Sequence, residues 1–197
     1  RGARIRESSG PLLTFLRYNM WDEARGILDY YYKAICLTGE IREHYPLDLD
    51  VTKVPDAAPD WKTIGFPESD LPSWIVLQHF WYYRATWDAD FIASRKSFLI
   101  ACLSRQRRED SALMRFSGDE TWWKPLSSLN LADLKKNPQF IAQGRDFDRR
   151  GHSLAAGTLF LVALQGMGDM VNGIDRRDHP DKWAMEPSDV KDKPSQK

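Results

Sequence analysis

The segment RFSGDETWW, residues 115–123, places two neighbouring carboxylates beside two tryptophans. Glu120 is a candidate proton donor, because apolar surroundings and the like charge of Asp119 both favour a carboxyl group that stays protonated near neutral pH. Trp122 and Trp123 offer flat apolar faces that suit the C–H groups of a sugar ring. The same segment also fits a short helix with a polar cap and Glu120 in its first turn. Local sequence leaves both interpretations open.

Charged residues also precede two segments in which apolar residues recur at helical spacing. Glu68 and Asp70 stand just before the segment that begins at Leu71, and Arg6 and Glu7 stand just before the first segment. Each pair has a structural alternative to a role in chemistry. Asp70 is a natural N-cap, and Glu7 could form an ion pair with a nearby arginine.

The chain is rich in aromatic residues, with eight Trp, seven Tyr and nine Phe. Several tryptophans, among them Trp61, stand beside charged residues in segments without a helical pattern. An aromatic face next to carboxylates suits a carbohydrate, whose ring packs on the aromatic face while its hydroxyls meet polar groups. The alternative is a large loop anchor that is buried except for its N–H group. For any single tryptophan the anchor is favoured, and the group as a whole favours a carbohydrate.

The charge balance argues against two classes of partner. Lysine plus arginine and aspartate plus glutamate both number 28, so the formal net charge is zero. We therefore expect neither nucleic acid nor a membrane as a partner. The longest apolar stretch, Leu154 to Leu164, is too short to span a bilayer. No signal peptide is visible, but the chain begins at Arg1 without a methionine, so the cellular compartment is left open.

Neither a metal nor a cofactor is expected from the sequence. Cys36 and Cys102 fall in apolar helical patterns typical of buried thiols, although a disulfide between them stays open. There is no Cys/His cluster with zinc spacing, no glycine-rich dinucleotide motif and no P-loop. His79 lies in an apolar helical segment, and we interpret it as a core residue with satisfied hydrogen bonds.

The spacing of apolar residues predicts helices through most of the chain. The predicted helices cover residues 10–20, 22–37, 71–86, 89–107 and 153–172, and two long irregular segments, 45–67 and 109–151, lie between them. Gly166 and Gly168 in the last helix predict close packing against a neighbour. We expect one helical domain over residues 1–173 and a charged, poorly ordered tail over residues 174–197.

Three stretches of the chain resemble the six-hairpin glycosidases: IRESSGPLLTFLRYNMWDEARGILDYYYKAICLTGEI, FPESDLPSWIVLQHFWYYRATWDADFIAS and RFSGDETWW. The resemblance covers most of the chain up to about residue 173. It implies an all-α fold of helical hairpins of the (α/α)6-toroid type, in which acidic residues on loops at one rim of the inner helices cleave glycosidic bonds. A complete toroid has twelve main helices and this sequence supplies about five, so the resemblance implies an incomplete domain.

The resemblance also implies roles for individual residues. Glu120 is the best match to a catalytic acid, and Glu68 and Asp70 are further catalytic candidates at the same rim. The expected substrate-binding residues are Asp119, Trp122, Trp123, Arg6, Glu7 and Trp61.

The leading hypothesis is therefore a glycoside hydrolase, or part of one, that acts on a carbohydrate substrate with two carboxylates as general acid and base. The alternative is a non-catalytic helical module that binds carbohydrate or protein through its aromatic loops. Because half a toroid would leave apolar helix faces uncovered, we also expect self-association or a need for further sequence.

Overall fold

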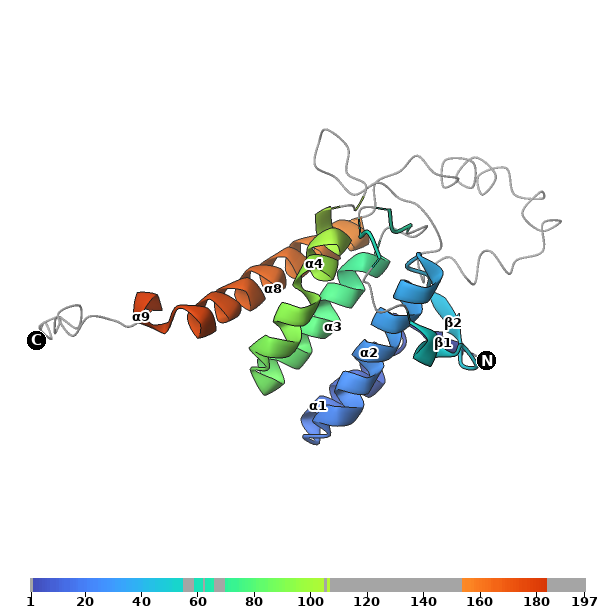
Figure 1. The fold of residues 1–197 in the computed structure, drawn as a ribbon, viewed down its shortest axis with the longest axis horizontal. Helices are drawn as coiled ribbons and strands as arrows, with labels where there is room; N and C mark the ends of the chain where they lie inside the picture. Colours follow the sequence, from blue (N-terminus) through green and yellow to red (C-terminus); the bar gives the residue numbers. More distant parts are fainter. Residues whose placement is uncertain are drawn as a thin grey trace, which may run out of the picture.

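The computed structural model describes residues 2–54, 59–61, 63–65, 70–104, 106 and 154–183. Most of these residues are helical, which confirms the all-α prediction (Figure 1). The described helices are α1 (Ser9–Arg17), α2 (Trp21–Thr38), α3 (Leu71–Thr86), α4 (Ala89–Ser104), α8 (Leu154–Asp178) and α9 (Pro180–Trp183), with a short 3-10 helix, η1 (Val51–Lys53). None of the described helices is both long and apolar enough to cross a lipid bilayer.

Helix α2 ends within one residue of its predicted end, whereas α1 ends at Arg17, three residues before its predicted end at residue 20. The chain leaves α1 at Tyr18, and Asn19 takes a positive φ of 56° that reverses its direction before α2. Helix α2 ends at Gly39, which has a φ of 67° and donates its N–H to the carbonyl of Ile35. Glycine adopts this left-handed conformation without a steric penalty, which is why helices commonly end there.

Helix α8 continues beyond its predicted end at residue 172, so the domain boundary expected at residue 174 falls inside a helix. Ile174 remains buried and packs with the core. Arg176 and Arg177 follow in the last turn, where cations interact favourably with the helix dipole. After α8, the short helix α9 ends at Trp183, and residues 184–197 of the expected tail lie outside the described residues.

The two short strands were not predicted from the sequence. Strand β1 (Gly2–Arg4) pairs antiparallel with β2 (His44–Pro46), with Ala3 opposite Tyr45. Tyr45 is fully buried, donates its hydroxyl to the carbonyl of Glu40 at 2.7 Å and accepts the N–H of Arg42 at 2.9 Å. This tertiary anchoring, rather than a local strand pattern, holds the small sheet together.

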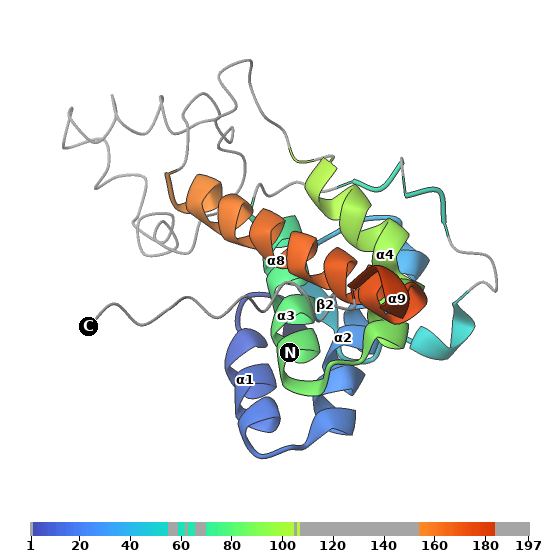
Figure 2. The same cartoon turned by 90° about the vertical axis from the view of Figure 1, so that its left-hand side faces the viewer.

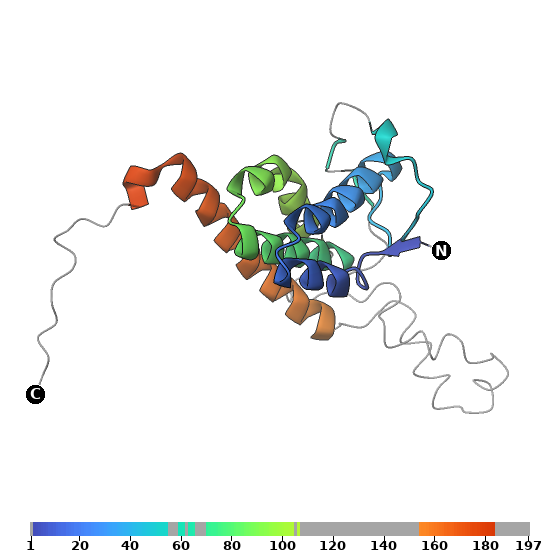
Figure 3. The same ribbon diagram turned by 90° about the horizontal axis from the view of Figure 1, so that it is seen from below.

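The helices form two antiparallel hairpins, α1–α2 and α3–α4, and α8 packs against α3 and α4 (Figures 1 and 3). Helix α8 runs parallel to α3, because Phe80 lies opposite Gly166 and Tyr83 lies opposite Gly173. Helix α3 is central: it contacts α1, α2, α4 and α8, and ten of its sixteen residues are buried. Helix α3 therefore forms the centre of the described helix bundle.

Candidate functional site

Buried polar side chains gather at one end of the helix bundle. Among the described residues, six polar or charged side chains are buried, and five of them lie where the N-terminal segment and the end of α4 meet the first half of α3. These five are Arg6, Asp70, Ser73, Gln78 and Gln106. We call this region the upper end of the bundle, because the first turns of α3 and α8 and the last turn of α4 lie at the top in Figures 1 and 2.

Arg6 and Asp70 form a bidentate ion pair at the upper end. The Arg6 Nε and Nη2 atoms each donate to one oxygen of Asp70 at 2.7 Å, and Arg6 Nη1 lies 3.0 Å from Glu43 Oε1. Arg6 and Asp70 are only 6% and 5% exposed. Asp70 occupies the N-cap position of α3, but its side chain makes no capping hydrogen bond. Both carboxylate oxygens are therefore engaged by the guanidinium in this arrangement.

Two glutamines join the chain segments around this ion pair. Gln78 Nε2 donates to the carbonyl of Ile5 at 2.7 Å and to Ser9 Oγ at 2.9 Å, which fixes the segment before α1 on α3. Gln106 Nε2 donates to Ser73 Oγ at 2.8 Å, which ties the chain after α4 to the first turn of α3. The upper end is thus a hydrogen-bonded polar region built from three parts of the sequence.

Most of the predicted catalytic and sugar-binding residues lie outside the described residues. Glu68 belongs to the segment just before α3, and the segment between α4 and α8 carries Asp119, Glu120, Trp122 and Trp123. The described residues that border both segments lie at the upper end. Residues 104 and 106 lie at the end of α4, and residue 154 begins α8. The structure therefore brings Arg6 and Asp70 together at the place where these two segments attach.

Trp61 lies in the core rather than on an open face. It is partly buried, and its ring centroid lies 4.9 Å from that of Phe98 and 5.5 Å from that of Tyr32. The guanidinium group of Arg95 stacks on the ring of Tyr32, with its central carbon 3.6 Å from the ring centroid. This environment favours the interpretation of Trp61 as a loop anchor over that of a sugar platform.

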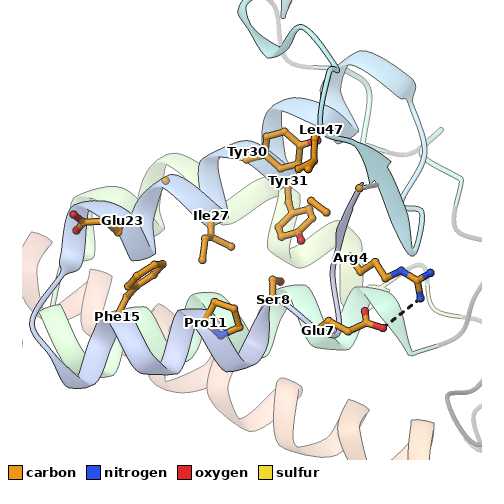
Figure 4. Close-up of a pocket in the computed structure, with 13 residues that line it drawn as sticks. Arg4, Glu7, Ser8, Pro11, Phe15, Glu23, Ile27, Tyr30, Tyr31 and Leu47 are labelled. Carbon is orange, nitrogen blue, oxygen red and sulfur yellow. Dashed lines mark hydrogen bonds and ion pairs between the residues drawn. The ribbon is translucent and has the colours of Figure 1, made fainter.

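Glu7 forms its ion pair with Arg4 rather than with the Arg6–Asp70 pair. Its side chain is 51% exposed and lies 3.4 Å from Arg4, so the structural alternative of a local ion pair describes its contacts. Glu7 instead lines a groove of about 620 Å³ between α1 and α2 (Figure 4). The sequence did not predict this groove, because its walls come from two helices whose aromatic residues carry no local signal of a cavity.

The groove is mostly apolar. Phe15 and Pro11 of α1 face Ile27, Tyr30 and Tyr31 of α2 across it (Figure 4). The further lining residues are Gly2, Ala3, Arg4, Glu7, Ser8, Glu23, Gly26 and Leu47. Burial raises the pKa of Tyr31 to about 12, so its hydroxyl stays protonated at neutral pH.

His79 is the sixth buried polar side chain, and it lies in the core. Its Nδ1 atom lies 2.8 Å from the carbonyl of Ile75, and its ring stacks on Phe91 with a centroid distance of 5.9 Å. Nε2 has no hydrogen-bond partner among the described residues, so the prediction of a fully satisfied core histidine is wrong at one nitrogen. Burial lowers the pKa of His79 to about 4, so the ring is neutral at physiological pH.

The two cysteines are free thiols. Cys102 is buried and Cys36 is partly buried, and burial raises the pKa of both. The prediction of inert buried thiols is confirmed for Cys102, and the disulfide left open by the sequence does not form. Within the described part of the chain, no three His, Cys, Asp or Glu side chains come together as metal ligands.

No family model, no curated protein and no solved structure matches this chain. Function is therefore inferred from the residues themselves and from the geometry of the upper end.

Proposed function

We propose that this chain carries part of a glycoside hydrolase and that the upper end of the bundle supports its sugar site. The observation behind this proposal is the attachment geometry. The segment that carries Glu120 leaves α4 and enters α8 at the end where Arg6 and Asp70 are paired, and the segment that carries Glu68 enters α3 there. The resemblance of these same stretches to six-hairpin glycosidases supports the assignment.

Within this proposal the carboxylates have different roles. Glu120 is the general acid, since the apolar tryptophans beside it favour a protonated carboxyl group. Glu68 is the second carboxylate, and the spacing between the two determines whether the product retains or inverts the anomeric configuration. Asp70 is a positioning residue, because both of its oxygens hold Arg6 and thereby fix the start of α3 two residues after Glu68. Asp119, Trp122 and Trp123 bind the sugar.

The test is turnover of a panel of aryl glycosides and oligosaccharides by a protein that contains this chain. The variant Glu120→Gln keeps the size of the side chain and removes proton transfer, so turnover should fall by about 10²–10⁴-fold. Asp169→Asn is the matched control. Asp169 is exposed on α8, so this substitution removes one carboxylate away from the proposed site. Equal turnover of the two variants on a substrate that the wild type cleaves would contradict the proposal.

The alternative of a non-catalytic carbohydrate-binding module makes a different prediction for the same proteins. Binding of an oligosaccharide without any turnover, with equal affinity in the wild type and Glu120→Gln, would favour it. Binding should then depend on Trp122, since stacking on a tryptophan face needs no proton transfer. Melting temperatures of all variants show whether a loss of binding reflects the site or the fold.

A further inference from the structure

The groove between α1 and α2 is an open surface with an apolar interior. Its walls are the antiparallel helices of the first hairpin, and β1 and Leu47 close one of its ends (Figure 4). Leu47 is 64% exposed, and Phe15 and Ile27 are only partly buried. Exposed apolar side chains gathered in a concave site mark a surface that binds something.

Gly26 makes the groove accessible from α2. It lies on the exposed side of the helix, and a Cβ atom added there would meet no atom within 4 Å. A glycine in a helix interior costs about 1 kcal/mol relative to alanine, and here no packing neighbour within the described residues requires it. Its effect is to leave the wall of the groove open at this position of α2.

The charged groups lie at the two ends of the groove. At the β1 end, Arg4 pairs with Glu7 at 3.4 Å and approaches Glu43 at 3.8 Å. Toward the other end, Glu23 is exposed and forms no ion pair with any described residue (Figure 4). Asp22, beside it in the first turn of α2, adds a second negative charge. The groove is thus apolar along its length and acidic where α2 begins.

We propose that this groove binds an amphipathic α-helix of a partner protein, with the apolar face of that helix between α1 and α2 and a lysine or arginine against Glu23. Two packed helices present a channel into which the side-chain ridge of a third helix fits. Helix α1 has nine residues, so the channel accommodates about 13 Å of the partner, or about two and a half turns. The acidic end supplies charge complementarity and fixes the direction of the bound helix.

Other ligand classes fit the groove less well. A sugar needs several free hydrogen-bonding side chains, whereas the polar groups at the β1 end of the groove already have partners: Arg4 pairs with Glu7, and the Tyr30 hydroxyl donates to the carbonyl of Pro46. A phosphate or nucleic acid would meet the unpaired Glu23. An apolar helix face satisfies its own backbone hydrogen bonds and needs only the apolar contact that this groove provides.

The experiment measures binding of two synthetic helical peptides of about 14 residues. Both carry leucines at i, i+4 and i+7 on an alanine background; one has lysines at the end that meets Glu23, and the other has glutamates there. The lysine peptide should bind about fivefold more tightly, and Glu23→Gln should remove that preference. Chemical-shift changes in a labelled protein should map to α1 and α2.

A Cβ atom at Gly26 meets nothing within 4 Å, so we expect Gly26→Leu to be tolerated, to occupy part of the groove and to lower the affinity for the lysine peptide at least about tenfold. Gly10→Leu is the matched control, because Gly10 also has open space around its Cβ direction but does not line the groove. Equal affinities of the two variants, or a preference for the glutamate peptide, would overturn the proposal. A wild-type dimer that Gly26→Leu dissociates would also overturn it, since the occupant would then be a second copy. Glycoside turnover is independent of every one of these outcomes.

Discussion

His79 is enclosed by aromatic rings of α4, and its position makes the fold sensitive to acid. Burial is the main cause that lowers its pKa to about 4, and Arg95 acts in the same direction, whereas the carbonyl of Ile75 and the carboxylate of Asp29 raise the pKa by less. In the unfolded chain a histidine titrates near pH 6.5. Between these two values the unfolded state binds a proton that the folded state does not bind, so stability falls as the pH falls.

The expected loss from His79 is on the order of 3 kcal/mol between about pH 6.5 and about pH 4. Urea unfolding across this range should show that His79→Phe lacks this part of the pH dependence, because phenylalanine keeps the stacking and removes the proton. His44→Gln is the control, since His44 is exposed on β2. The prediction fails if the wild type and His79→Phe lose stability in parallel as the solution is acidified.

The Arg6–Asp70 pair should behave as a coupled unit. Replacing Arg6 with Met leaves the Asp70 carboxylate buried without its partner, which costs about 3–5 kcal/mol for a buried ion pair. The double variant Arg6→Met/Asp70→Leu removes both charges, so it should lose less stability than the sum of the two single variants. A double-mutant cycle of denaturant midpoints measures this coupling. Additive effects within error would show that the pair contributes no interaction energy.

At the level of the single residue, the sequence located Arg6 and Asp70 because charged residues stood just before apolar helical segments. It could not show that they bind each other, because 64 residues separate them. Their pairing depends on how α1 packs on α3. The groove was missed for the same reason: Phe15 and Tyr31 look like ordinary amphipathic positions until two helices are placed side by side.

The contact between α3 and α8 depends on the absence of side chains at two glycines, Gly166 beside Phe80 and Gly173 beside Tyr83. A Cβ atom added to Gly166 would lie 2.8–3.1 Å from three atoms of Phe80, whereas one added to Gly168 would meet nothing within 4 Å. Gly166→Ala should therefore destabilise the protein by about 1–3 kcal/mol through overpacking. Gly168→Ala should stabilise it by about 0.5–1 kcal/mol, because alanine has the higher helix propensity.

Thermal melting should show a lower melting temperature for Gly166→Ala and a higher one for Gly168→Ala. Shifts of the same sign and size would mean that Phe80 moves aside without cost. The sequence predicted that Gly166 and Gly168 both permit close packing. The structure confirms this for Gly166, whereas Gly168 has no neighbour within 4 Å of an added Cβ atom. The face that a glycine occupies on a helix decides its role, and that face depends on the neighbouring helix.

The helices themselves were largely predictable, because the spacing of apolar residues and the turn at Gly39 are local signals. The strands β1 and β2 were not, since each has only three residues and their pairing depends on the buried Tyr45. The end of α8 was placed too early because its last turns are charged. The charged residues predicted a helix end near residue 172, but the buried side chain of Ile174 keeps the next turn of α8 packed on the core.

At the scale of the whole molecule, one face of α8 remains open. Leu161, Val162 and Leu164 are 65%, 47% and 48% exposed. Contiguous apolar side chains of this kind promote association, so we predict concentration-dependent self-association in sedimentation experiments. The variant Leu161→Gln/Leu164→Gln should shift the protein toward the monomer, and Gln165→Ala, a neighbouring exposed position, should not. A wild type that sediments as a single monomeric species at every concentration would contradict this prediction.

Residues 2–6 contact three distant parts of the chain: β2 through the small sheet, Asp70 through Arg6, and Gln78 through the carbonyl of Ile5. The two helical hairpins, by contrast, are closed by short turns. In kinetic terms, the hairpins are contacts of low sequence separation that can form early, whereas the N-terminal segment must close loops of about 40 to 73 residues. We therefore expect residues 2–6 to dock late in folding, in the step that completes the polar region at the upper end.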